Sequence, residues 1–272
     1  MSALSGQVAV ITGAASGIGK ALAEDLAGRG CKLALADLNE QALAELAAEL
    51  TKRGCQVITC RLDVADRAAV EAFANEVKTH FGRADLLFNN AGVSLSQTVE
   101  HTDYNDFEWL MNINFWGVVH GTKAFLPLMR EQRSGHIINI SSLFGLIGVP
   151  TQAAYNASKF AVRGFTEALR QELRGSGIEV SCVHPGGIKT NIMRNARFYV
   201  DTKGHSDMQA AVSQFDRIAT TEPHVAAKVI LDGVSSNKAR ILIGLDAKLL
   251  SLIQRLLPVG YQGLLGYFLK KS

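Results

Sequence analysis

The sequence Val8-Ala-Val-Ile-Thr-Gly-Ala-Ala-Ser-Gly-Ile-Gly19 decides the fold. Its first residues belong to a short apolar run, residues 7–12, which is rich in β-branched residues and predicts a buried parallel strand. Glycines stand at positions 13, 17 and 19, and residues 20–29 have a helical composition. A strand, a glycine-rich turn and a helix in this order predict a dinucleotide-binding βα unit, in which the helix N-terminus faces a pyrophosphate.

Strand-like and helix-like segments alternate through the rest of the chain. Further strands are expected at residues 31–36, 56–62, 84–88, 136–140, 178–183 and 240–243, and further helices at residues 40–53, 66–80, 103–130 and 151–174. This alternation predicts an α/β, doubly wound Rossmann fold with a single parallel seven-stranded sheet and helices on both faces. We expect one domain over residues 1–245, followed by an apolar C-terminal extension over residues 246–272.

Composition narrows the class of protein. Apolar residues make up 47% of the 272 residues and charged residues 19%, which suits a folded protein with a large core. The formal net charge of +3 comes without a basic run, so no nucleic-acid partner is expected. The four cysteines lack metal-site spacing and read as small apolar residues in a reducing compartment. With neither a signal peptide nor a membrane-length apolar segment, the expected location is cytoplasmic.

An acidic residue ends the second expected strand. Asp37 stands 18 positions after Gly19, close to where this fold places an acid on the adenosine ribose. A carboxylate there accepts hydrogen bonds from free ribose hydroxyls and repels a 2′-phosphate, which neither Ser16 nor Leu38 could neutralise. We therefore expect NAD as the cofactor rather than NADP. The alternative role is that of a helix N-cap, taken by Asp37 or Asn39, and the two roles are compatible.

Polar residues also follow the third and fourth expected strands. Asp63 and Val64 come directly after residues 56–62. The Asp63 carboxylate would either reach the adenine edge of the cofactor or remain a solvated loop acid. The tight polar turn Asn89-Asn-Ala-Gly92 closes the fourth strand.

Three residues on the expected helices carry further chemistry. Asn114 lies in an otherwise apolar stretch, residues 113–119, where its amide is either a satisfied core group or marks a helix distortion that holds a water for proton relay. Tyr155 and Lys159 are four residues apart and share one helix face. A nearby ammonium is expected to lower the pKa of the phenol from about 10, which would let Tyr155 exchange a proton near neutral pH. The alternative is a Tyr–Lys pair on a solvated helix face.

Taken together, these motifs resemble the short-chain dehydrogenase/reductase family over about residues 6–244. The resemblance rests on residues 12–19, Asn89-Asn-Ala-Gly92, Asn114, Ser142, Tyr155 with Lys159, and Pro185-Gly186 with Thr190. The interval of 13 positions between Ser142 and Tyr155 matches the usual one in the family. His184 departs from the pattern, because the family often has Asn before the Pro-Gly pair. We expect a packed or backbone-bonded histidine there rather than a catalytic one.

The resemblance implies a catalytic tetrad of Asn114, Ser142, Tyr155 and Lys159. Tyr155 would exchange the hydroxyl proton, Ser142 would hydrogen-bond the reacting oxygen, and Lys159 would bind the nicotinamide ribose, with a water placed by Asn114 behind it. Hydride would pass directly between substrate and nicotinamide, so no metal is expected. The residues expected to bind the cofactor are Gly13, Ser16, Gly17, Ile18, Gly19, Asp37, Asp63, Val64, Asn90, Ala91, Gly92, Tyr155, Lys159, Pro185, Gly186, Ile188 and Thr190.

The substrate site is expected between residues 143–150 and residues 192–220, which supply apolar side chains. Such walls favour a hydrophobic secondary alcohol and its ketone over a sugar. Residues 187–221 are expected to form a lid that orders on binding. The residues expected to contact the substrate are Ser142, Phe144, Val149, Gln152, Tyr155, Gly187, Ile192 and Met193. The resemblance also implies a homodimer or homotetramer, paired through the helices that contain Asn114 and Tyr155.

The C-terminal extension is apolar over most of its length. Leucine and isoleucine recur at helical spacing at positions 249, 250, 252, 253, 256 and 257, and after Pro258 come Tyr261, Leu264, Leu265, Tyr267 and Phe268. We expect this segment to pack on its own domain or on a partner subunit. The alternative is peripheral membrane contact helped by Lys270 and Lys271. In either case the extension could close over the substrate site.

The sequence thus predicts an NAD-dependent oxidoreductase that transfers a hydride between a nicotinamide cofactor and a hydrophobic secondary alcohol or its ketone. One alternative is a catalytically silent, dinucleotide-binding regulatory protein, which would be expected to lack part of the tetrad, whereas all four residues are present. Another is an NADP-linked 3-oxoacyl reductase. A third is a docking module in which the extension is the functional part.

Overall fold

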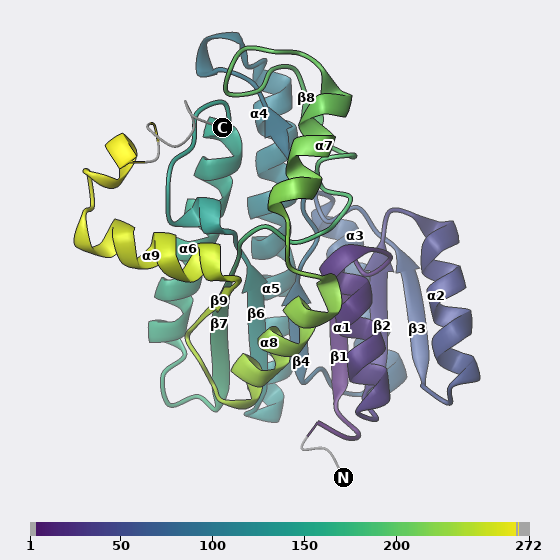
Figure 1. Cartoon of the computed structure of the whole chain (residues 1–272). Helices are drawn as coiled ribbons and strands as arrows, with labels where there is room; N and C mark the ends of the chain where they lie inside the picture. Colours follow the sequence, from purple (N-terminus) through teal and green to yellow (C-terminus); the bar gives the residue numbers. More distant parts are fainter. Residues whose placement is uncertain (1–3, 265, 267–272) are drawn as a thin grey trace.

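Seven parallel strands form the central sheet, in the order β3-β2-β1-β4-β6-β7-β9 (Figure 1). These strands are β1 (Val8–Thr12), β2 (Lys32–Asp37), β3 (Val57–Arg61), β4 (Leu86–Asn89), β6 (Gly135–Ile140), β7 (Ile178–Pro185) and β9 (Arg240–Ile243). The computed structural model describes residues 4–264 and residue 266. The predicted α/β, doubly wound fold with one parallel seven-stranded sheet is confirmed.

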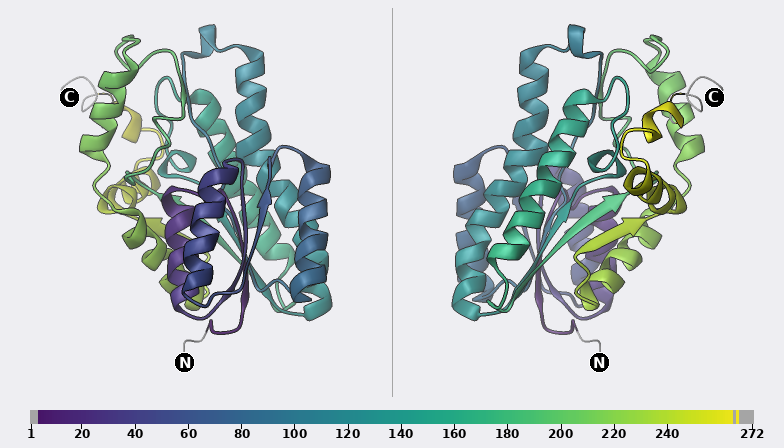
Figure 2. Two further views of the ribbon diagram at one scale, coloured as in Figure 1. Left: turned by 90° about the vertical axis from the view of Figure 1, so that its right-hand side faces the viewer. Right: turned by 90° about the vertical axis from the view of Figure 1, so that its left-hand side faces the viewer.

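Helices cover both faces of this sheet, as Figure 2 shows. The first face carries α1 (Gly17–Gly28), α2 (Glu40–Lys52) and α8 (Pro223–Ser235). The second carries α3 (Arg67–Phe81), α5 (Gly117–Gln132) and α6 (Ala153–Glu172). Because both faces of the sheet are covered, the central strands are apolar on both sides, and β1 and β4 are buried at every position.

The order of the strands fixes where a ligand can bind. β1 lies between β2 and β4, so the winding of the chain reverses beside it. In open parallel sheets a binding crevice lies beyond the carboxyl ends of the strands at such a reversal. The predicted site residues lie largely in the segments that leave these ends, and the parallel register therefore brings them to one edge of the sheet.

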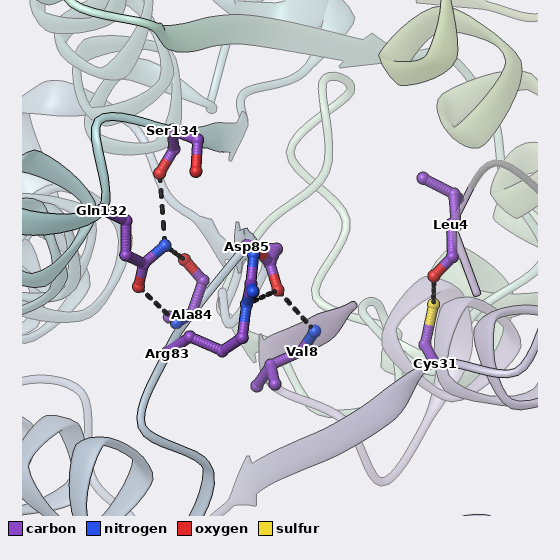
Figure 3. Close-up of polar contacts among 8 residues, drawn as sticks. All are labelled: Leu4, Val8, Cys31, Arg83, Ala84, Asp85, Gln132 and Ser134. Atoms are coloured by element: carbon purple, nitrogen blue, oxygen red, sulfur yellow. Dashed lines mark hydrogen bonds and ion pairs between the residues drawn. The ribbon is translucent and has the colours of Figure 1, made fainter. Parts of the chain in front are cut away.

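Polar contacts connect the segments at the amino ends of the strands, opposite the carboxyl ends where the site is expected (Figure 3). The carboxylate of Asp85 accepts a hydrogen bond from the backbone N–H of Val8 at 2.8 Å and pairs with Arg83. The side chain of Gln132 accepts from the N–H of Ala84 and donates to the carbonyl oxygen of the same residue. These contacts tie the amino ends of β1 and β4 to the end of α5, at the far side of the sheet from the site.

Several features depart from the predicted elements. The helix expected over residues 103–130 is divided into α4 (Tyr104–Met111) and α5 by a π-helical turn, Asn112–Trp116. The segment expected to form a lid contributes β8 (Arg197–Phe198), which pairs with β5 (Leu95–Ser96) in a second, two-stranded sheet, and α7 (Met208–Ile218). The small sheet, α7 and α8 were not among the predicted elements; each strand of the small sheet has only two residues, too few for a sequence pattern.

The apolar extension forms α9 (Leu245–Leu256) and a further turn. One face of this segment packs on the loop after β6, in a cluster that joins Ala247, Leu250, Ile253 and Tyr261 to Leu143, Leu146 and Ile147. The predicted packing on its own domain is confirmed for this face. Leu265, Tyr267, Phe268, Lys270 and Lys271 lie outside the described residues. In the described part of the chain, no helix is both long and apolar enough to cross a membrane.

Candidate active site

The glycine-rich turn between β1 and α1 is tightly closed. Gly13 and Gly17 have φ angles of 65° and 53°, which glycine adopts without strain. A Cβ atom at Gly19 would lie 2.1 Å from the carbonyl oxygen of Gly13, so no side chain fits there. The amide of Asn90 donates to the carbonyl oxygens of Thr12 at 2.9 Å and Gly13 at 3.1 Å. The turn after β4 therefore holds the glycine-rich turn in place.

Asp37 ends β2 with its carboxylate bonded to the glycine-rich turn. One carboxylate oxygen accepts from the N–H of Ala15 and the other from the N–H of Asn39, both at 2.9 Å. The N-cap of α2 is Asn39, whose side chain accepts from the N–H of Ala42 at 3.1 Å. Of the two residues considered for the N-cap, Asn39 takes that role, and Asp37 lines the cavity where a ribose is expected.

A small cavity of about 120 Å³ adjoins Asp37 at the ends of β2 and β3. Its walls include Asp63 and Val64, the residues expected near the adenine. One oxygen of Asp63 accepts from the N–H of Ala65 at 2.9 Å, which fixes the turn after β3. Asp63 is therefore placed at a cavity beside the ribose position, while its contact with adenine stays a prediction.

The side chain of Asn114 clamps two segments of the site together. Its Oδ1 accepts from the N–H of Val93 at 2.8 Å, and its Nδ2 donates to the carbonyl oxygen of Val93 at 2.9 Å and to the Ser158 hydroxyl at 3.2 Å. The residue is fully buried and lies in the π-helical turn. The amide of Asn114 is therefore satisfied, and the helix is distorted around it, so these two expectations are compatible. The water for proton relay stays a prediction.

Ser142, Tyr155 and Lys159 lie together at the carboxyl edge of the sheet. The Ser142 hydroxyl accepts from the N–H of Phe144 at 3.1 Å, which holds it at the start of a 3₁₀ turn. Tyr155 and Lys159 are only 8% and 4% exposed on the first turns of α6. The ammonium nitrogen of Lys159 lies 5.6 Å from the centre of the Tyr155 ring and donates to the carbonyl oxygen of Ile140 at 3.1 Å. A solvated Tyr–Lys pair is therefore wrong.

Burial controls the protonation of this pair. It raises the pKa of Tyr155 to about 12, and a hydrogen bond with Ser142 acts in the opposite direction. Burial also lowers the pKa of Lys159 to about 8. In the chain alone the Tyr155 pKa is therefore raised, because desolvation of the phenolate dominates. Tyr155 is consequently a neutral phenol near neutral pH. The expected lowering, for which a second positive charge would act beside Lys159, stays a prediction.

A cavity of about 610 Å³ joins the glycine-rich turn to these residues. All eight residues expected to contact substrate line it, as do most of those expected to bind the cofactor. Gly19 and Asn114 lie outside its walls and act through neighbours. A Cβ atom at Gly92 would lie 3.2 Å from Oδ1 of Asn114 and 3.4 Å from Nζ of Lys159, so these two polar groups meet around that glycine.

The lid is fastened to α4 by a cluster that the sequence did not predict. The Asp106 carboxylate pairs with Arg197 and accepts a hydrogen bond from the Tyr199 hydroxyl at 2.7 Å. The guanidinium of Arg197 also stacks 3.8 Å above the centre of the Trp109 ring. These hydrogen bonds, that from Tyr199 first, lower the pKa of Asp106. The partners are more than 90 positions apart, so no local pattern announces the contact.

Asp246 is a further anchor that sequence reasoning missed. Its carboxylate accepts from the N–H of Gly187 at 2.7 Å, directly after β7. A Cβ atom at Gly186 would lie 2.1 Å from the same carboxylate, so the glycine pair makes room for it. Leu250 and Asp246 line the large cavity, and the Tyr261 hydroxyl accepts from the N–H of Gly148 at 2.9 Å. The extension therefore helps to shape the substrate site.

His184 is packed and bonded to the backbone, as predicted. It is fully buried, and its Nδ1 lies 2.9 Å from the carbonyl oxygen of Ser142. A carbonyl only accepts, so Nδ1 carries the proton and donates it. The other ring nitrogen is buried and has no hydrogen-bond partner among the described residues. Burial lowers the pKa of His184 to about 4, so the imidazole that supports Ser142 is neutral.

Comparisons with known proteins agree with this geometry. The short chain dehydrogenase family model matches residues 7–199. The chain is 49% identical over 267 residues to the putative oxidoreductase SadH of Mycobacterium tuberculosis, covering 97% of this chain and 95% of that protein. It is 36% identical to the C alpha-dehydrogenase of a Sphingobium species, covering 87% and 80%. A short chain dehydrogenase/reductase from Burkholderia phymatum, solved in complex with NAD, is similar with a TM-score of 0.86 and 34% identity over 94% and 95% of the chains. The chain belongs to the short-chain dehydrogenase/reductase family.

Proposed function

We propose that this protein is an NAD-dependent oxidoreductase that transfers a hydride between the cofactor and a hydrophobic secondary alcohol or its ketone. The observation that carries the proposal is a single cavity lined by the glycine-rich turn, Asp37, Ser142, Tyr155 and Lys159. A dinucleotide lying from the turn toward Lys159 would end beside a phenol and a hydroxyl. When bound, its nicotinamide would supply or accept the hydride.

Four side chains have separate roles in the rest of the proposed reaction. The Tyr155 hydroxyl donates a proton to the carbonyl oxygen during reduction and takes it back during oxidation. The Ser142 hydroxyl hydrogen-bonds the same oxygen and stabilises the negative charge that develops on it. Lys159, protonated below a pKa of about 8, supplies a positive charge to the same space. Asn114 fixes the backbone at Val93 and the helix at Ser158, so that both walls of the site keep their spacing.

The protonation of Tyr155 supports its role in the reducing direction. With a pKa raised to about 12, the phenol holds its proton near neutral pH and can donate it to a developing alkoxide. For oxidation, the phenolate must be stabilised by further positive charge, which Lys159 supplies in part. In the chain alone the phenol is therefore in the protonated state, which carbonyl reduction requires.

The residues around the glycine-rich turn suit a dinucleotide. Because a Cβ atom would collide at Gly19, the backbone of this turn is left bare beside the N-terminus of α1, which attracts a pyrophosphate. At the other end, Asp37 presents a carboxylate held by two backbone N–H groups. Among the described residues lining the two cavities, Lys159 is the only cation, so a 2′-phosphate would meet no positive charge near Asp37. This favours NAD over NADP.

The walls of the substrate end are mainly apolar. They come from the loop after β6, from the lid and from α9. The apolar lining residues are Leu143, Phe144, Val149, Ile192, Met193, Phe198, Phe215, Ile218 and Leu250. Such walls suit a hydrophobic or aromatic secondary alcohol, and the relative named C alpha-dehydrogenase supports dehydrogenation as the reaction.

A homo-oligomer is part of the same proposal. Trp116, at the end of the π-helical turn, is 47% exposed, and Phe160 on α6 is 40% exposed. Large aromatic side chains on the outer faces of these two helices suit a contact with a second copy of the chain. Sedimentation velocity of the wild-type protein and of Phe160→Glu tests this, and an unchanged mass in the variant would contradict it.

The function is tested by a panel of secondary alcohols and ketones with NAD and NADP, measured for the wild type and Tyr155→Phe. We expect turnover with NAD, and a loss of about 10³-fold or more in kcat in the variant, because the proton donor is removed. Dinucleotide binding, followed by fluorescence of the reduced cofactor, should stay within about threefold. A folded wild type that binds NAD but turns over no substrate would support the silent regulatory protein instead.

The cofactor preference is tested separately by Asp37→Ala. Removing the carboxylate should lower kcat/KM with NAD and raise it with NADP, because repulsion of the 2′-phosphate is relieved. A wild type that already prefers NADP would contradict the assignment. It would leave the NADP-linked 3-oxoacyl reductase as the better reading.

A further inference from the structure

α9 has two apolar faces, and the described residues cover only one of them. Ala247 is buried, and Leu250 and Ile253 are partly buried, against the loop after β6. On the outer side, Leu245, Leu249, Leu252 and Leu256 are 83%, 59%, 53% and 69% exposed. We call these four residues the α9 leucine stripe. Their spacing of four, three and four positions places them along one line of the helix.

The stripe runs the whole length of α9, unlike a single exposed apolar residue. It runs over eleven positions, or about 16 Å at about 1.5 Å per residue. Single exposed leucines are normal on proteins, whereas an unbroken row on one helix marks an interaction surface. Figure 1 shows α9 at the outer edge of the molecule, with its outer side away from the sheet. The stripe is therefore accessible to a large partner.

Two basic residues border the stripe on the same side. Lys248 and Arg255 each precede a stripe leucine by one position, and both are exposed. Neither forms an ion pair within the described part of the chain. The opposite border holds Ile253 and Asp246, and the Asp246 carboxylate is bonded to the N–H of Gly187. The stripe thus has a positive border on one side, and the one acid of α9, Asp246, is exposed on the other side with its carboxylate bonded to a neutral N–H group.

This distribution of charge argues against an antiparallel pair of α9 helices, one from each of two copies, as the occupant. The spacing of the leucines would suit a two-helix seam. In an antiparallel pair related by a two-fold axis, however, each border faces its own copy. Lys248 and Arg255 would then face Arg255 and Lys248 of the other copy, and like charges at such a contact are unfavourable.

We propose that the outer face of α9 docks on an anionic lipid surface. The leucine stripe would enter the boundary between head groups and acyl chains, with the helix lying in the plane of the interface. Lys248 and Arg255 would be attracted to the negative head groups along one border. This contact is peripheral and is independent of the reaction proposed above. Leu250, on the inner face of the same helix, lines the large cavity, so docking places one cavity wall a helix width from lipid.

The test is cosedimentation of the full-length protein with vesicles. One set contains phosphatidylglycerol and phosphatidylcholine, and the other contains phosphatidylcholine alone. We expect the wild type to bind the anionic vesicles. Two double variants, Leu249→Gln/Leu252→Gln and Lys248→Glu/Arg255→Glu, should each bind at least about tenfold more weakly. The control is Lys228→Glu/Lys238→Glu, which makes the same change in net charge at exposed lysines of α8 and of the turn before β9. It should bind like the wild type.

Three results would overturn the proposal. The first is no binding of the wild type to anionic vesicles. The second is an equal loss of binding in the control variant, which would show attraction to the overall charge rather than to α9. The third is a lower mass of the leucine variant in sedimentation velocity without vesicles, which would assign the stripe to a second copy of the chain. Circular dichroism and thermal unfolding show whether the variants are folded, since all four substituted positions are exposed.

Discussion

One wall of the large cavity carries Ser142, Tyr155 and Lys159, and the segment proposed as a lid, residues 187–221, faces it, but different contacts hold the two. In the wall, Ser142 accepts a hydrogen bond from the N–H of Phe144, Lys159 donates to the carbonyl oxygen of Ile140, and Tyr155 is buried beside them. The lid segment is held by the two-residue pairing of β8 with β5, by the pair of Arg197 with Asp106, and by exposed ion pairs such as Lys189 with Glu222. A broken buried hydrogen bond leaves an unpaired polar group, whereas an exposed ion pair contributes about 0–1 kcal/mol. The wall should therefore be rigid and sensitive to substitution, and the lid adjustable.

After Tyr155→Phe, the largest effect in the wall is expected for Ser142→Ala. Loss of the hydroxyl removes a donor to the reacting oxygen and should lower kcat/KM by about 10²- to 10³-fold. The neighbouring variant Ser141→Ala is the matched control, because its hydroxyl donates to the backbone oxygen of Lys159 rather than to substrate. Steady-state kinetics should show a loss of less than about tenfold in that control. Equal losses in both variants would contradict a direct role for Ser142.

The next effect is expected for Asn114→Leu. The leucine has a similar size but leaves the N–H and the carbonyl oxygen of Val93 without their partner. The free energy of unfolding should fall by about 2–4 kcal/mol, since each buried unpaired group costs about 1–3 kcal/mol. Urea unfolding at pH 7 measures this. A decrease below about 1 kcal/mol would show that Asn114 does not hold the wall together.

Acid should destabilise the protein through two buried histidines, His184 beside Ser142 and His136 near the amino end of β6. Burial lowers the pKa of His184 and of His136 to about 4, so the unfolded chain binds protons below about pH 6.5 while the folded chain does not. Stability is therefore complete above this range and falls as the pH is lowered toward 4, by up to about 3 kcal/mol for each histidine.

The variant His184→Asn isolates one of these contributions. Asparagine keeps a donor for the carbonyl oxygen of Ser142 but does not titrate. Urea unfolding at pH 7 and pH 5 should show a pH dependence smaller than in the wild type by about 2 kcal/mol. The same slope in both proteins would mean that His184 already takes up a proton in the folded state.

The smallest effect is expected in the lid, for Asp106→Asn. The variant weakens the contacts with Arg197 and Tyr199, worth about 1 kcal/mol, and should change KM by about fivefold with little change in the free energy of unfolding. Asp216→Asn is the control, because its pair with Arg194 is exposed on both sides. It should change KM by less than about twofold. A larger effect of Asp216→Asn would mean that the outer ion pair fastens the lid.

The strands and the motifs at their ends could be predicted from the sequence, whereas the contacts of the lid segment could not. The strands could be placed because they are continuous apolar runs, and β9 begins and ends at the predicted residues, Arg240 and Ile243. The proposed tetrad could be named from the resemblance to the family, because each member stands in a motif of fixed spacing at the end of a strand or on a helix. The parallel register then brings these motifs to one edge without further information.

The remaining parts of the site depend on contacts that spacing does not encode. Asp106 and Tyr199 are 93 positions apart, and the anchor Asp246 lies 59 positions after Gly187. Burial raises the pKa of Tyr155 in the chain alone, and the sequence shows the neighbouring lysine but not the extent of this burial. Contacts between residues that are far apart in the chain leave no local sequence pattern. The pKa of a buried group depends on how completely the whole fold excludes water from it.

Asp246 also joins two parts of the molecule that are otherwise separate. It lies in the first turn of α9, and its carboxylate accepts the N–H of Gly187, where the lid begins. A displacement of α9 along its axis would move the backbone at Gly187 through this hydrogen bond, without any rearrangement of the sheet. Whatever binds the outside of α9 would thus be separated from the start of residues 187–221 by a single hydrogen bond.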